Sequence, residues 1–322
     1  MKSYPCRFGV LIWALTLGLG FALASSAAEV AKKLLVVTVT TGFRHGSIPV
    51  GEEVIAKLAA ESGEFSVDFV REPSPRPAPP REPKRAAAES DDSFAAKTAK
   101  FQVEQADWKT RDAVWLEQTR RLLAERMSLA ALAKYDGVIF ANTTGDLPLP
   151  DREGFLSWIR SGKAFIGMHA ATDTFLNYPP YLEMIGGAFI SHPWHQPVTI
   201  RVEDAKHPAT APYGATFEVA EEIYQFKRWE RNQLHVLMSL DPANEERPKQ
   251  VVKPGEPALG FFERGVRPDR DYAVAWTKEY GAGRVFYTSL GHEEAVWRDE
   301  KYQRHLLGGI RWALGLAPAA SK

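Results

Sequence analysis

Histidines stand at the ends of three apolar segments that lie far apart in the chain: His45, His169 and His292. Each segment is short and rich in β-branched or aromatic residues, which is typical of a buried strand. In open parallel sheets, ligands bind outside the carboxyl ends of the strands. We therefore expect the three imidazoles to face one crevice, with Asp146 joining them from a fourth strand end. The alternative for each histidine is a loop residue that only bonds backbone.

His169 and His292 are the predicted acid and base, because imidazole titrates near neutral pH and transfers protons there. The residues around His169 read Gly-Met-His-Ala-Ala, a pattern that favours a strand-to-helix turn exposing a reactive side chain. The alternative is a packing turn in which the imidazole caps a helix.

His192 and His195 form a second cluster, separated by Pro193 and Trp194. A lone His-x-x-His pattern is a weak metal signal, because zinc sites need three or four ligands in a fixed geometry. With His45 or His169 alongside, three ligands and an open position become available. A divalent metal such as zinc is therefore a candidate cofactor, held by His45, His192 and His195.

Two carboxylates, those of Glu221 and Glu222, lie close in sequence to the aromatic residue Tyr224. Paired acids most often form a solvated edge, but Glu222 is also a candidate general base or an acceptor for sugar hydroxyls. Four aromatic side chains are candidates for a surface on which a sugar ring stacks, with core packing as the alternative for each. They are Trp194, Tyr224, Trp229 and Trp297.

The segments that must position these side chains alternate between strand and helix patterns. Residues 34–40 and 65–70 are predicted strands on either side of a helix over 50–62, which makes a parallel β-α-β unit. The later segments continue the pattern and end with a glycine-containing hairpin and a terminal helix. Strands are predicted over 135–141, 163–169, 198–202, 217–219, 235–240, 273–277 and 284–288, and helices over 150–161 and 302–314.

Residues 71–130 interrupt this alternation. Six prolines lie among charged residues in 71–85, which predicts an extended and solvated segment. A heavily charged helix is predicted over 94–127. The apolar content of 71–130 is too thin for a core of its own, so we interpret it as an insertion rather than a separate domain.

Residues 1–28 have the order of a secretory signal peptide: basic residues, an apolar run over 10–24, and small residues up to Ala28. The run is short for a membrane span. We expect cleavage near Ala28, a domain over 29–316 and a periplasmic or secreted protein with no stable membrane insertion; an uncleaved anchor is the alternative. Cys6 is the only cysteine, so the mature chain would have none.

The charge balance and the missing motifs narrow the function further. Lys and Arg together number 40, as do Asp and Glu, which gives no reason to expect nucleic acid as a partner. The sequence has no GxxxxGK[ST] motif and no glycine-rich turn of the dinucleotide type, so no nucleotide cofactor is expected. The Gly-x-Ser-x-Gly motif of serine hydrolases is also missing.

Motifs in a fixed order resemble the trehalose-utilisation, or ThuA-like, family. They are Gly42-Phe43-Arg44-His45, Gly167 through Thr174, His192-Pro193, His207-Pro208, Glu222-Ile223-Tyr224, Ala275-Trp276-Thr277, and Gly283-Arg284-Val285 through Gly291-His292. The likeness runs from about residue 34 to 314, apart from the insertion. It implies a flavodoxin-like fold of the class I glutamine amidotransferase type, a mostly parallel α/β sheet with helices on both faces. His169 stands where those enzymes carry a nucleophilic cysteine, so we do not expect a glutaminase.

The resemblance further implies an enzyme that acts on a sugar, a 3-keto disaccharide or a related glycoside, and the signal-peptide pattern predicts that this enzyme is exported. Proton abstraction beside a keto group, by His169 and His292 with Glu222, would allow isomerisation, or elimination followed by hydration. The expected substrate contacts are Arg44, Thr172, Asp173, Tyr224 and Trp297. Two alternatives are a non-catalytic carbohydrate-binding module and an interaction protein that uses the proline-rich insertion as a docking arm.

Overall fold

The computed structural model describes residues 1–4, 31–245 and 271–317. The predicted signal peptide lies almost wholly outside the described residues. The described residues from Ala31 onward belong to one unit.

Nine strands form one sheet in the order β2-β1-β3-β4-β9-β8-β7-β5-β6. The first five of these are parallel, whereas β8, β7, β5 and β6 continue the sheet as antiparallel neighbours. The strands are β1 (Lys32–Val37), β2 (Phe65–Val70), β3 (Gly137–Ala141), β4 (Ala164–Met168), β5 (Ala188–Val202), β6 (Thr216–Lys227), β7 (His235–Leu240), β8 (Ala273–Tyr280) and β9 (Gly283–Thr288). The α/β fold with a parallel half is thus confirmed.

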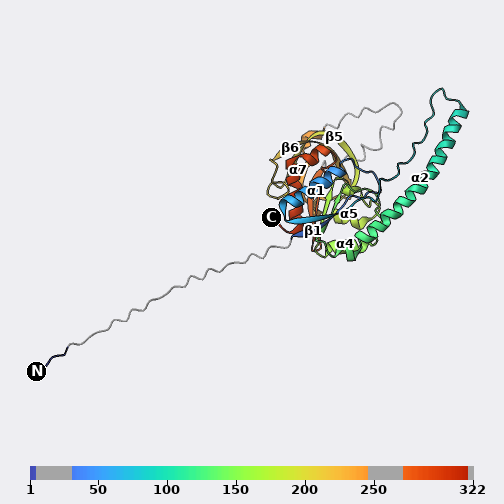
Figure 1. The fold of residues 1–322 in the computed structure, drawn as a ribbon. Coiled ribbons are helices and arrows are strands. Elements are labelled where there is room, and N and C mark those ends of the chain that lie inside the picture. Colours follow the sequence, from blue (N-terminus) through green and yellow to red (C-terminus); the bar gives the residue numbers. More distant parts are fainter. Residues whose placement is uncertain (5–30, 246–270, 318–322) are drawn as a thin grey trace. The chain divides into compact units, whose positions relative to one another are not determined.

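Helices cover both faces of the sheet (Figure 1). Successive strand residues point to opposite faces, so Leu34 and Val36 join one core and Leu35 and Val37 the other. The first core lies under α1 (Ile48–Ser62), α6 (Glu294–Arg298) and α7 (Glu300–Leu314). The second lies under α3 (Leu129–Leu132), α4 (Arg152–Arg160), α5 (Pro179–Ile185) and the end of α2 (Asp91–Arg126).

The sequence predicted the bounds of β2 and β7, but β5 and β6 are much longer than the expected 198–202 and 217–219. Their pairing shifts register at two places near Ser191, which breaks the alternation that identifies a strand. The prolines within β5 also argue against a strand, because proline is rare inside sheets. The consequence is that His192, His195 and Glu222 all lie on one long antiparallel ribbon.

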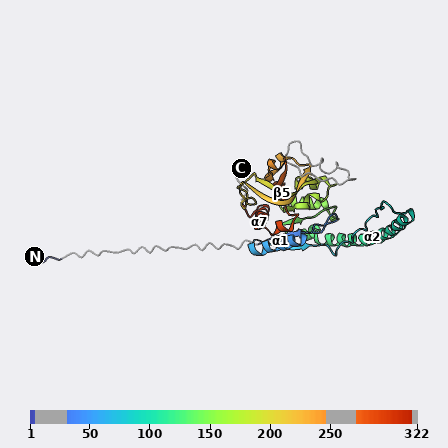
Figure 2. The same ribbon diagram turned by 90° about the horizontal axis from the view of Figure 1, so that it is seen from above.

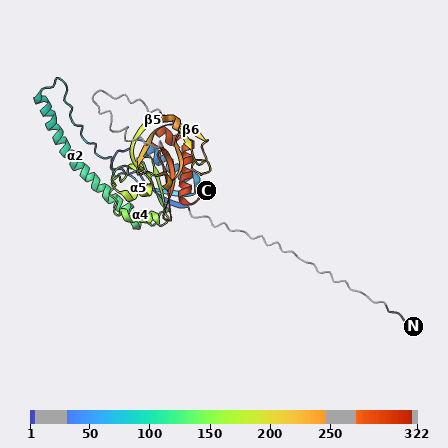
Figure 3. The same ribbon diagram turned by 180° about the vertical axis from the view of Figure 1, so that it is seen from behind.

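The insertion contains a long helix, α2, whose first half reaches away from the sheet (Figures 2 and 3). Its buried residues all lie from Asp112 onward. The proline-rich segment has no helix or strand over 71–85, as predicted, but it is tied to α2. Two indole N–H groups donate to its carbonyls, Trp108 to Pro77 at 2.9 Å and Trp115 to Ser74 at 2.8 Å.

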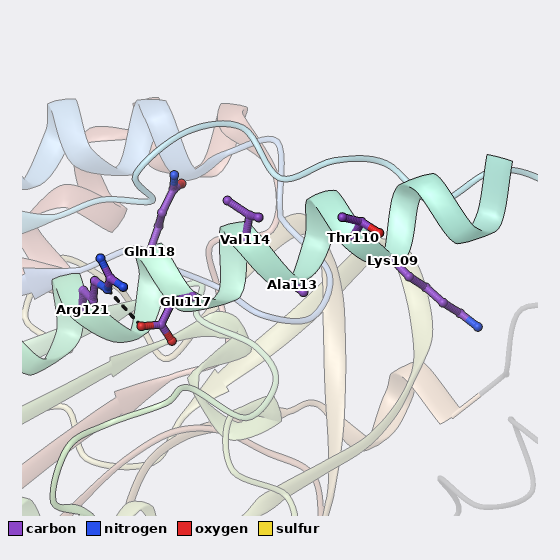
Figure 4. Close-up of a pocket in the computed structure, with 7 residues that line it drawn as sticks. All are labelled: Lys109, Thr110, Ala113, Val114, Glu117, Gln118 and Arg121. Carbon is purple, nitrogen blue, oxygen red and sulfur yellow. Dashed lines mark hydrogen bonds and ion pairs between the residues drawn. The ribbon is translucent and has the colours of Figure 1, made fainter. Parts of the chain in front are cut away.

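One face of α2 lines a shallow hollow that mixes charged and apolar side chains (Figure 4). Val114 is 55% exposed there, and Glu117 pairs with Arg121 at 2.9 Å. Among the described helices, none combines the length and the apolar character needed to cross a membrane.

Candidate functional site

Four side chains from four separate segments meet at the carboxyl edge of the parallel strands. His45 follows β1, His169 follows β4, His292 follows β9, and Glu222 comes from β6. One nitrogen or carboxylate oxygen from each lies within 4.8 Å of those of the other three. We call this set the histidine–glutamate cluster. The structure therefore brings together the three histidines that the sequence analysis placed at one edge of the sheet.

Three members of the cluster form a tight triangle. The His292 Nδ1 atom lies 3.2 Å from Glu222 Oε2 and 3.3 Å from His169 Nε2, and the latter two atoms are 3.5 Å apart. The His45 ring packs edge-on against the other two imidazoles, with centroids 4.8 Å from His169 and 5.3 Å from His292. His45 Nδ1 is buried and has no hydrogen-bond partner.

His169 is held in one orientation and one tautomer. It has a left-handed φ of 45°, at the turn where β4 passes into the 3-10 helix η1 (His169–Asp173). Its Nδ1 lies 2.7 Å from the carbonyl oxygen of Ser289. A carbonyl only accepts hydrogen bonds, so in the neutral ring Nδ1 carries the proton and Nε2 offers its lone pair to the cluster.

Glu221 fixes the loop that carries His292. This side chain is fully buried, and its carboxylate accepts the backbone N–H groups of Gly291 at 3.1 Å and His292 at 3.0 Å. It also accepts the N–H of Glu222 at 3.0 Å. Neighbouring residues on β6 point to opposite faces, so Glu221 supports the loop while Glu222 reaches the cluster. Burial raises the pKa of Glu221 above its usual value.

The cluster combines one imidazole that stays neutral, that of His45, with one carboxylate. Burial, aided by the two neighbouring histidines, lowers the pKa of His45 to about 3. Burial alone would raise the pKa of Glu222, but the close approach of the His169 and His292 imidazoles, with His192, outweighs it and holds that pKa below its usual range. The hydrogen bond with Glu222 raises the pKa of His292. At neutral pH His45 is therefore uncharged and Glu222 is an anion.

The other predicted metal ligands stand beside the cluster. His192 Nδ1 lies 3.0 Å from Glu222 Oε1, so it contacts the outer oxygen of the same carboxylate. His195 Nε2 lies 2.8 Å from Glu293 Oε1, and these two form a more exposed group with His292. The structure therefore does not bring His45, His192 and His195 together as one set.

The predicted substrate contacts differ in burial and in the groups they already bond. Arg44 donates to the Thr38 carbonyl at 3.2 Å and pairs with Glu72 at 3.2 Å. Asp173 is half-buried near His169, and burial raises its pKa to about 6. The remaining contacts are buried: Thr172, Tyr224 and Trp297.

Burial leaves the predicted aromatic stacking residues little surface for a ligand. Trp297 is 0% exposed and donates its indole N–H to the Gly291 carbonyl at 2.8 Å. Tyr224 packs against the His169 ring, with centroids 4.3 Å apart. Trp194 and Trp229 are also buried.

Asp146, which was expected to join the three histidines, is not part of the cluster. Its carboxylate pairs with Arg152 at 3.0 Å.

Sequence reasoning gave no role to two features of the site. One is the supporting contact made by Glu221, for which the sequence offers no signal because its partners are backbone groups. The other is Phe43, which is 66% exposed beside His45. Its position two residues before His45 was the available signal.

Comparison with known proteins identifies relatives of this chain. Residues 88–313 match the family model described as trehalose utilisation. A ThuA-like protein from Bacteroides uniformis is 20% identical, with a TM-score of 0.54 over 91% of this chain and 95% of its own. One from Parabacteroides merdae is 16% identical, with a TM-score of 0.55 over 91% and 92%. These structures share the fold. No curated protein sequence matches this chain.

Proposed function

The chain belongs to the trehalose-utilisation (ThuA) family, and on that premise we propose that it is an exported, sugar-processing enzyme whose reaction centre is the histidine–glutamate cluster. Family membership supports a role with sugars. The observation that carries the enzymatic part is the meeting of four potential ligands or proton carriers at the sheet edge. This is the position at which open α/β sheets bind their ligands.

We propose further that the cluster holds a divalent metal ion. In a tetrahedral site with bonds of 2.0–2.1 Å to nitrogen and oxygen, neighbouring ligand atoms lie roughly 3.3–3.4 Å apart. The three separations among His169, Glu222 and His292 are 3.2, 3.3 and 3.5 Å. Octahedral neighbours at the same bond length would lie only about 2.9 Å apart. The triangle therefore suits zinc or a similar ion.

The surroundings of the cluster support the same proposal. Histidines that bind metals usually donate their second ring N–H to a carbonyl or carboxylate, which fixes the ligating lone pair. His169 does this through the Ser289 carbonyl. Two histidines with one carboxylate form a ligand set that leaves positions open for substrate. His45 has a ring nitrogen within 4.8 Å of the other three ligand atoms, and its Nδ1 is buried without a hydrogen-bond partner, so a small shift of the ring would make it a fourth ligand.

This proposal regroups the roles expected from the sequence. There, His169 and His292 were an acid/base pair and His45, His192 and His195 held the metal. In the proposed site, His169, His292 and Glu222 are ligands with His45. His192, which is 35% exposed and touches the outer oxygen of Glu222, lies where an entering substrate meets the cluster.

A bound divalent ion would polarise a carbonyl or hydroxyl oxygen of the substrate. Polarisation of a keto group makes the neighbouring C–H more acidic. With His192, beside the cluster, to take that proton, a 3-keto glycoside could undergo isomerisation, in which the proton returns to the neighbouring carbon, or elimination of the protonated aglycone followed by addition of water. The proposed substrate is therefore a disaccharide or other glycoside in its oxidised keto form. The proposal includes neither a nucleotide cofactor nor a nucleic-acid partner. A protein that binds such sugars without converting them is the alternative.

Metal analysis tests the cofactor. We expect the purified protein to bind about one equivalent of zinc or a similar ion after chelation and reloading. His169→Ala and His292→Ala should abolish this binding. His235→Ala is the matched control, since His235 also contacts a carboxylate, Asp204 at 2.9 Å, but lies outside the cluster. Retention of the metal by both cluster variants would contradict the proposed site.

Turnover of oxidised and unoxidised disaccharides, trehalose included, tests the activity. We expect conversion of a 3-keto disaccharide by the metal-loaded protein and its loss in His169→Ala, with the circular dichroism spectrum unchanged. Turnover that needs His169 but no metal would instead support the sequence-based prediction that His169 and His292 act as acid and base. Saturable binding without product over long incubation would favour the binding module. Unchanged turnover in His169→Ala would overturn the reaction centre.

A further inference from the structure

An exposed aromatic ring stands directly beside the cluster. Phe43 is 66% exposed, and its ring meets that of His45 edge-to-face, with centroids 4.9 Å apart and planes at 85°. Among the large apolar side chains that are exposed in the described ranges, Phe43 is the one that contacts a cluster residue. A single exposed phenylalanine is common on protein surfaces. Its position next to a proposed metal ligand is what calls for an explanation.

The backbone holds Phe43 in this exposed position. The Thr144 hydroxyl donates to the Phe43 carbonyl at 2.8 Å, and the N–H groups of Thr41 and Gly42 donate to the Thr144 carbonyl at 3.1 and 3.3 Å. A Cβ atom on Gly42 would lie 2.7 Å from the Thr144 hydroxyl oxygen, so the two loops are in close contact. The loop is therefore fixed by these contacts, and it holds the Phe43 ring in an exposed position.

A cleft lined by both charged and apolar side chains lies next to the same loop. Arg44 lines it together with Glu52, Arg71 and Glu72, and its volume is about 350 Å³. This volume is in the range of small-molecule sites. One carboxylate oxygen of Glu72 is buried without a hydrogen-bond partner, although the other pairs with Arg44. Arg71 pairs with Glu52 and Arg44 with Glu72, so the second Glu72 oxygen is the acceptor that the cleft offers to a hydroxyl, next to the loop that carries Phe43.

We propose, on the basis of the proposed function, that Phe43 is the platform of a subsite for a pyranose ring. A pyranose has C–H groups on its faces and hydroxyls around its edge. Its face would pack on Phe43, which would direct edge oxygens toward His45 and the cluster. The next unit of a glycoside would then lie in the cleft lined by Arg44 and Glu72. The substrate class is therefore a pyranoside of at least two units, and not a small keto compound.

Ligand binding to the metal-loaded protein tests this subsite, with trehalose and 3-keto-trehalose as ring-containing probes and dihydroxyacetone as a small keto probe. We expect Phe43→Ala to weaken binding of whichever of the two disaccharides binds more tightly by roughly tenfold. This is the effect expected when the apolar area buried on an aromatic ring is lost. Phe43→Trp should retain the affinity. Dihydroxyacetone binding, metal content and thermal stability should be unchanged in both variants.

Val103→Ala is the matched control, because Val103 is 71% exposed on α2, away from the cluster. Equal disaccharide affinities of the wild type and Phe43→Ala would overturn the subsite while leaving the proposed function standing. A loss of metal in Phe43→Ala would instead make Phe43 a support for His45 and also overturn the subsite. If the wild type binds none of the sugars, the proposed substrate class and the subsite both fail.

Discussion

At the scale of single residues, the site depends on backbone groups as much as on side chains. The Ser289 carbonyl sets the tautomer of His169, and the buried Glu221 carboxylate holds the N–H groups of Gly291 and His292. Neither Ser289 nor Glu221 is among the groups of the proposed reaction centre. Both act by orienting imidazoles, which is how residues around a metal tune the affinity of its ligands.

Glu221→Gln tests this positioning role. An amide keeps one acceptor but turns an NH2 group toward backbone donors, so the loop that carries His292 should shift. We expect zinc affinity to fall by about 10- to 100-fold in a protein that still folds. The measurement is competition with a chromophoric chelator, with Glu279→Gln on the exposed side of β8 as control. Zinc affinity equal to that of the wild type would exclude the role.

At the scale of elements, the antiparallel ribbon β5–β6 adds to the parallel sheet the carboxylate that completes the cluster. The parallel strands β1 and β4, together with β9, deliver three histidines to one edge because their carboxyl ends align. Glu222 arrives from β6, at the far edge of the same sheet. The ribbon must therefore curve back over the strand ends, and the register shifts in β5 near Ser191 provide such a bend.

The packing of α7 against the segment after His207 offers a test at this scale. A Cβ atom on Gly308 would lie 2.2 Å from the Pro208 carbonyl oxygen, a backbone atom that cannot rotate away. Alanine favours a helix interior over glycine by about 1 kcal/mol, whereas overpacking costs about 1–3 kcal/mol. We expect Gly308→Ala to lower the free energy of unfolding, as measured in urea. Gly46→Ala is the control, since its Cβ would meet nothing within 4 Å. A stabilised Gly308→Ala protein would contradict this close contact.

At the scale of the whole molecule, the insertion is an arm on one domain. The first half of α2 buries no side chain, and Pro77 and Trp108 meet at its base. The hollow on α2 around Val114 belongs to the arm and lies on a different element from the cluster residues.

The export proposal is also tested on the whole chain. Expression of the full sequence in a Gram-negative host should give a periplasmic protein whose N-terminus, by intact mass and sequencing, lies near Glu29. Replacing Leu17 and Leu19 by arginine should disrupt the apolar run and keep the protein in the cytoplasm, whereas the same change at exposed positions of α2 should not. An unprocessed protein that stays in the membrane fraction would indicate an anchor instead.

The sequence alone was enough for the α/β class, the family and the strand ends that carry His45, His169 and His292. These depend on local patterns, since an apolar run followed by a histidine is visible without knowledge of the rest of the chain. The tertiary structure decided which groups act together. Glu222 lies in the cluster, His192 and His195 lie beside it, and Trp297 is buried in the core. The reason is that the path of β5 and β6 depends on bulges and on pairing across the sheet, which no local pattern of residues encodes.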